Sequence, residues 1–168
     1  NKSENISRLL EDSPFIIGKT EYLNSPMVTA GDRVYMVGHQ DGSFPELGWH
    51  IKDEMGGIWN HPIKLMDGFD VELLKDEQVI KLDSATQFVN YPWGNEHIYA
   101  FAKANLEIFR TQFVPDGQQG IVIQYELKNT ATSSQNLQLK FNGHADLRPT
   151  WLGEQTAMID TQDKATYD

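Results

Sequence analysis

The sequence contains no cysteine among its 168 residues. A disulfide framework, a thiolate zinc site and a cysteine nucleophile are therefore all excluded. Positive charge is also scarce: 14 Lys and Arg stand against 24 Asp and Glu, giving a formal net charge of −10. Nucleic acids and anionic membrane surfaces bind through cationic groups, so we expect neither as a partner.

Long apolar runs and phosphate-binding loops are missing as well. No stretch of eighteen apolar residues occurs, so the sequence predicts no membrane-spanning helix. Neither a Gly-rich phosphate loop nor the Gly-x-Ser-x-Gly pattern of a serine nucleophile is present. No signal peptide is visible at Asn1, and we expect the chain to be a processed piece of a longer protein.

The length and composition favour one folded domain over residues 1–168. Apolar residues make up 39% of the chain and aromatic residues 11%, which is enough for a substantial core. We find no internal repeat, low-complexity segment or linker that would divide the chain.

The clearest structural signal is an alternation of apolar and polar residues in the second half. Ile121, Ile123, Tyr125 and Leu127 share one side of an extended segment, and Leu137, Leu139 and Phe141 share one side of another. This period of two is typical of half-buried antiparallel strands. With the β-rich segment 106–114 before them, these segments predict a three-stranded meander.

The first half predicts shorter strands and one helix. Strands are expected at residues 33–38, 58–74, 79–83 and 97–103, with turns at Asp67-Gly68 and residues 75–78. A short helix is expected at residues 3–11. The fold class predicted is all-β, an antiparallel β-sandwich with one short N-terminal helix.

Candidate binding residues are aromatic and charged side chains outside the alternating runs. Trp49, Trp59, Trp93 and Trp151 all lie in Gly- and Pro-containing contexts, where an indole ring either stacks on a sugar or plugs an end of the sandwich. Asp146 and Arg148 follow the last predicted strand and either bind sugar hydroxyls or form a structural ion pair.

Evidence for catalytic carboxylates or a metal site is weak. The pairs Asp53-Glu54 and Asp67/Asp70 read as surface carboxylates, because 24 acidic residues place some pair at any chosen spacing. His39 with Asp41 and His144 with Asp146 have the i, i+2 spacing that a strand would turn to one side, but a metal site needs further ligands. We therefore predict no metal and no cofactor.

The second half resembles the N-terminal β-sandwich of glycogen-debranching-like glycoside hydrolases. The residues that carry the resemblance are segments 110–117, 125–129, 137–141 and 146–151, with 56–62 and 67–69 in the first half. The resemblance covers about residues 25–155 and implies a large supersandwich similar to the fold of galactose mutarotase. It also implies that the general acid and base lie on an (α/α)6 catalytic domain, which 168 residues cannot include.

The resemblance implies a non-catalytic N-terminal domain of a secreted or periplasmic enzyme. Its partners would be its own (α/α)6 catalytic domain and an oligo- or polysaccharide. Trp59, Asp146, Arg148 and Trp151 are the implied carbohydrate-binding candidates. Two alternatives stay open: a free-standing carbohydrate-binding module, and a mutarotase-like sugar epimerase that uses His97 or His144 as its acid.

Overall fold

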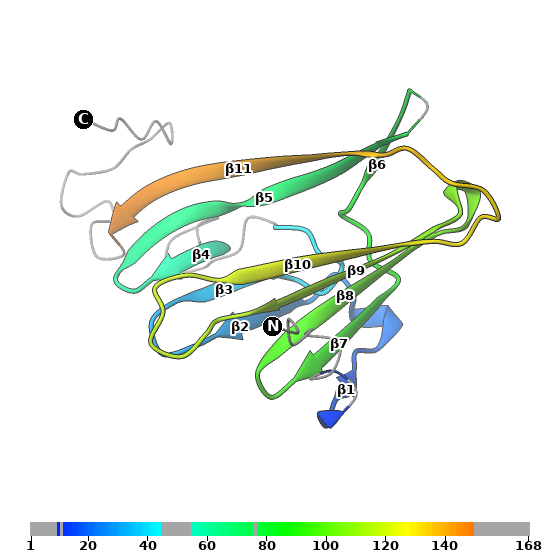
Figure 1. Cartoon of the computed structure of the whole chain (residues 1–168). Coiled ribbons are helices and arrows are strands. Elements are labelled where there is room, and N and C mark those ends of the chain that lie inside the picture. The colour runs from blue at the N-terminus through cyan, green and yellow to red at the C-terminus, as the bar shows by residue number, and fades with distance from the viewer. Residues whose placement is uncertain (1–9, 11, 45–54, 76, 150–168) are drawn as a thin grey trace, which may run out of the picture.

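The structure, a computed structural model, describes residues 10, 12–44, 55–75 and 77–149. Two antiparallel sheets form it (Figure 1). Sheet A has the order β1 (Ile16–Ile17), β7 (Gln87–Tyr91), β8 (Gly94–Phe101), β9 (Leu106–Phe113), β10 (Val122–Asn129). Sheet B has the order β11 (Gln138–Pro149), β5 (Ile63–Lys75), β4 (Gly57–Asn60), β3 (Tyr35–His39), β2 (Pro26–Ala30), and β6 (Gln78–Lys81) also pairs with β5.

The predicted all-β sandwich is confirmed. The inward-facing side chains of the two sheets form one apolar core that includes Met36 of β3, Leu73 of β5, and Ile108 of β9. Helical structure in the described strand-connecting segments is limited to the short 3-10 helices η1 (Thr20–Tyr22) and η2 (Ala102–Ala104). The helix predicted at residues 3–11 lies almost entirely outside the described residues, and none of the described helices is long and apolar enough to cross a membrane.

The meander predicted for residues 106–142 is wrong in its last step. β9 and β10 pair over their full length, but β11 crosses to sheet B and pairs with β5. Alternation specifies only that one side of a strand faces the core, and that requirement is met equally well in either sheet. Residues 130–137 supply a connection long enough to cross between the two layers, which lie about 10 Å apart in such folds.

The turn predicted at Asp67-Gly68 is also wrong, because β5 continues through it. Chain reversal occurs instead at residues 61–62, between β4 and β5. A Cβ atom on Gly68 would lie 2.4 Å from Cγ of Phe44, so the glycine allows an aromatic ring to pack directly on the strand. The turn at residues 75–78 is confirmed, since β5 ends at Lys75 and β6 begins at Gln78.

Polar side chains occupy part of the space between the sheets. The amide nitrogen of Gln112 donates to the Asn95 side-chain oxygen at 2.9 Å, and the hydroxyl of Thr29 donates to that same oxygen. Asn95 in turn donates to the Val28 carbonyl at 3.1 Å. These bonds tie β8 and β9 of sheet A to β2 of sheet B, and a sequence read by alternation alone does not reveal them.

Candidate functional site

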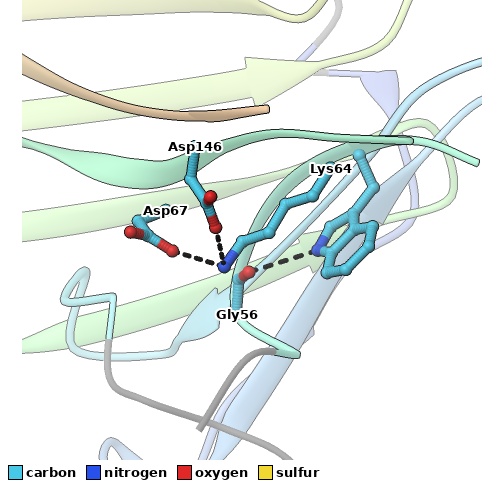
Figure 2. Close-up of polar contacts among 5 residues, drawn as sticks. Gly56, Lys64, Asp67 and Asp146 are labelled. Carbon is cyan, nitrogen blue, oxygen red and sulfur yellow. Dashed lines mark hydrogen bonds and ion pairs between the residues drawn. The ribbon is translucent and has the colours of Figure 1, made fainter. Parts of the chain in front are cut away.

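The ammonium group of Lys64 is the centre of a charged cluster at one end of sheet B. Its Nζ lies 3.0 Å from Oδ2 of Asp146 and also forms an ion pair with Asp67 (Figure 2). Lys64 and Asp146 are buried, whereas the Asp67 side chain is 44% exposed. The cluster therefore combines a cation held inside the protein with one carboxylate that solvent and ligands can reach.

Strand register explains why these residues meet. Arg148 and Trp59 are both registered with Lys64, from the strands on either side of β5. Register shifts interrupt the β11–β5 ladder between His144 and Arg148, and such bulges re-aim side chains. As a result Asp146, far from Lys64 in the sequence, reaches the ammonium group.

Trp59 lies against this cluster and is almost completely buried. Its indole Nε1 donates to the Gly56 carbonyl at 3.1 Å, its ring stacks on Tyr35 at 6.3 Å, and the Lys64 ammonium lies 5.7 Å from its centroid. The cation–π geometry and the bonded N–H hold the ring in place. In this arrangement the indole supports Lys64, and any contact of Trp59 with a sugar remains a prediction.

The other predicted site residues are placed only in part. Asp146 is brought together with Trp59 through Lys64, as described above. Arg148 lies on β11 beside Lys64 in register, and its side chain is outside the described set. Trp151 and Trp49 lie outside the described residues altogether.

Sequence reasoning missed Lys64 and Asp67 as members of the site. A signal was present: Lys64 interrupts the apolar series Ile63, Leu65 and Met66, and a lysine in such a strand needs a partner when it is buried. Asp67 was interpreted as a surface carboxylate beside a turn, and that turn does not exist.

The two His/Asp pairs of the sequence do not build a metal site in the described residues. His144 and Asp146 have different partners, because His144 Nε2 contacts Asp70 Oδ2 at 2.7 Å while Asp146 contacts Lys64. The part of the chain that the structure describes contains no group of three or more His, Asp or Glu arranged to hold a metal ion.

A row of aromatic rings lies on sheet A, with Tyr91 buried and Trp93 half-buried. The rings of Tyr91 and Trp93 stack at 5.1 Å, Phe113 meets Trp93 edge-on at 6.1 Å, and Phe15 lies 6.1 Å from Tyr91. The Trp93 indole donates to the Ser13 hydroxyl at 2.9 Å and is half-buried. Of the described tryptophans, Trp93 offers the more accessible ring.

No protein-family model, curated protein or solved structure matches this chain. The resemblance to glycogen-debranching-like glycoside hydrolases therefore stays a prediction from the sequence.

Proposed function

We propose that this chain is a non-catalytic β-sandwich domain of a glycogen-debranching-like glycoside hydrolase acting outside the cytoplasm. It packs on an (α/α)6 catalytic domain and contributes polar side chains to carbohydrate binding. The observation that carries the proposal is the Lys64 cluster, in which segments far apart in the sequence converge on one buried cation with an exposed carboxylate beside it.

The chemistry of the cluster suits sugar hydroxyl groups. A carboxylate accepts hydrogen bonds from hydroxyls, and bonds to charged groups are the stronger ones. Asp67 is the accessible member, and the buried pair of Lys64 with Asp146 fixes its position. A preorganised carboxylate loses less conformational entropy on binding than a freely mobile one.

Calorimetric titration of the purified chain with linear and branched glucans tests this proposal. We expect weak saturable binding without hydrolysis, reduced about tenfold by Asp67→Asn because a charged hydrogen bond is lost. Asp70→Asn is the matched control, since Asp70 lies on the same strand and contacts His144. Hydrolysis by the chain alone, no binding, or equal loss with both variants would contradict the proposal.

The aromatic row of sheet A favours a second candidate, a free-standing carbohydrate-binding module. The half-buried ring of Trp93, stacked on the buried Tyr91, is of the kind that packs against the apolar face of a pyranose ring. If Trp93→Ala abolishes glucan binding and Asp67→Asn leaves it unchanged, the module is the better description.

The epimerase alternative gains no comparable support. Burial is the main cause, and the nearby charge of Arg110 the second, that holds the pKa of His97 well below its ordinary value. The ring is therefore neutral and is a weak general acid. His144 is exposed on the strand surface with Asp70 as its partner.

A further inference from the structure

The two sheets end on the same side of the sandwich. β10 is the last strand of sheet A and β11 is the first strand of sheet B, and residues 130–137 connect them (Figure 1). Within the described residues, neither strand has a neighbour on its other edge. Unpaired strand edges expose rows of N–H and C=O groups that are ready to pair with another chain.

Large apolar side chains are exposed on both edge strands. Leu127 of β10 is 38% exposed, and Leu139 and Phe141 of β11 are 48% and 53% exposed. Their strand register places them on the core side: Leu127 is registered with Ile108, Leu139 with Leu73, and Phe141 with Val71. Side chains that face the core and are still half exposed indicate a core that is uncovered along this side.

A buried cation lies beneath the same side. Arg110 of β9 is almost completely buried, and its guanidinium donates to the Gly42 carbonyl at 2.9 Å, contacts His97, and lies 5.4 Å from the Phe69 ring centroid. Among the described residues no carboxylate pairs with Arg110, and its Nε has no hydrogen-bond partner. A buried charge without a counter-charge is unfavourable.

Tyr125 joins Arg110 to the open side. The two residues are registered opposite each other, and Tyr125 belongs to the edge strand β10. Its buried hydroxyl oxygen interacts with the Arg110 side chain, and its O–H has no acceptor among the described residues; the buried hydroxyl of Tyr99 has no hydrogen-bond partner there. Burial raises the pKa of Tyr125 to about 12 against the opposing charge of Arg110, so the hydroxyl keeps its proton and can donate it. Buried polar atoms with unfilled hydrogen-bonding capacity require a partner.

We propose that the side of the sandwich between β10 and β11 is a docking surface for an extended segment of a partner protein. That segment pairs with a strand edge, covers Leu127, Leu139 and Phe141 with apolar side chains, and directs one Asp or Glu carboxylate toward Tyr125 and Arg110. None of Leu127, Leu139, Phe141, Tyr125 and Arg110 belongs to the Lys64 cluster, although β11 also carries Asp146, so this proposal and the proposed carbohydrate site can fail independently.

Charge complementarity selects this occupant over a second copy of the chain. A second copy would bring another net charge of −10 and another buried Arg110 to the same interface. A partner strand with one carboxylate and otherwise apolar side chains can pair with the Arg110 cation and also cover Leu127, Leu139 and Phe141.

The experiment uses two short synthetic peptides that alternate Val with Thr and Lys. One has Glu and the other Gln at a central position on the Val side, and binding is followed by fluorescence anisotropy. We expect the Glu peptide to bind about tenfold more tightly, because a charge-assisted hydrogen bond is about twice as strong as a neutral one. Amide hydrogen exchange should show protection gained in β10 or β11.

Variants separate the apolar contribution from the polar one. Phe141→Thr should weaken both peptides about tenfold by removing an apolar contact. Tyr125→Phe should reduce the preference for Glu and leave the Gln peptide unchanged, and it avoids substituting Arg110 in the core. Val28→Thr is the control, since Val28 is 54% exposed on β2 at the opposite edge of sheet B.

Several results would overturn the docking proposal. These are equal binding of the Glu and Gln peptides, no binding of either, protection confined to other strands, or equal weakening by Val28→Thr and Phe141→Thr. Acetate alone producing the same protection of β10 and β11 would show a small-anion site in place of a docking surface. Self-association on sedimentation, lost in Phe141→Thr, would assign the surface to a second copy.

Discussion

Substitution of Gly57 by alanine should strongly destabilise the fold, because this glycine allows β4 to approach β5 closely. Gly57 has φ +98°, a conformation that side-chain-bearing residues rarely adopt. A Cβ atom there would lie 2.0 Å from the Met66 carbonyl oxygen and 2.9 Å from the Asp67 carbonyl carbon. Both atoms belong to backbone, so the collision is relieved only by separating the two strands.

The size of the effect follows from comparison with Gly117. Gly117 also has positive φ, at +69°, but a Cβ there would have no atom within 4 Å. Gly117→Ala therefore carries only the conformational penalty, about 1 kcal/mol. Gly57→Ala adds a backbone collision, which as forced overpacking contributes about 2 to 3 kcal/mol more. The reduced entropy of the unfolded chain is common to both variants and cancels in the comparison.

Thermal unfolding followed by tryptophan fluorescence and circular dichroism measures this difference. At about 3 °C per kcal/mol for a chain of this size, Gly57→Ala should melt roughly 6 to 9 °C below Gly117→Ala. Because Trp59 and Lys64 lie beside Gly57 in sheet B, Gly57→Ala should also weaken glucan binding. Equal stabilities of the two variants would refute the close approach of β4 and β5.

Three further predictions concern buried ionisable groups. His97 is neutral in the fold but binds a proton below pH 6.5 when unfolded, so stability should fall below that pH by up to about 1.4 kcal/mol per pH unit, and urea denaturation should show this slope removed in His97→Gln. Burial raises the pKa of Glu96, so the stability that its protonated form contributes is lost as pH rises above 4.5. Glu96→Gln should therefore stabilise the chain more at pH 7 than at pH 4, as urea denaturation at the two pH values would show. An equal gain at both pH values would contradict the burial of Glu96. Lys64→Met should lower the free energy of unfolding by about 3 kcal/mol because it leaves Asp146 buried without its counter-charge, and the double variant Lys64→Met with Asp146→Leu should lose much less. Additive losses in calorimetric melting would argue against a coupled pair.

Alternation predicted the strands with long, regular faces and little else. β10 and the first half of β11 were expected at nearly their observed limits because apolar residues recur there at every second position, and β9 was expected as a β-rich segment that ends at a turn. β2 and β7 were missed, and β2 begins with a proline that reads as a strand breaker; length is not the reason, because β3 also has five residues and was expected at residues 33–38. Sheet membership was not predictable, because it depends on where the 130–137 connection leads.

The candidate site was predictable as residue types but not as a constellation. Asp146 and Trp59 were selected for their chemistry, and the structure connects them through Lys64, which no motif marks. Their meeting depends on register shifts in β4, β5 and β11. A one-residue change of register turns a side chain to the other face, and a local sequence pattern does not encode such shifts.

Inward-facing positions that carry polar residues in place of apolar ones are also the positions where hydrogen bonding within this sandwich is incomplete. Where inward positions carry apolar residues such as Leu73 or Ile108, these side chains are buried in the core between the two sheets. Where they carry His97, Arg110 and Tyr125 in one registered row, hydrogen bonding is incomplete. The His97 ring contacts the His39 carbonyl, whereas Nε of Arg110 has no partner and the Tyr125 O–H has no acceptor among the described residues. Under the docking proposal, a partner strand beside β10 supplies the acceptor that this row lacks. His97, Arg110 and Tyr125 are therefore the polar residues on which the docking proposal rests.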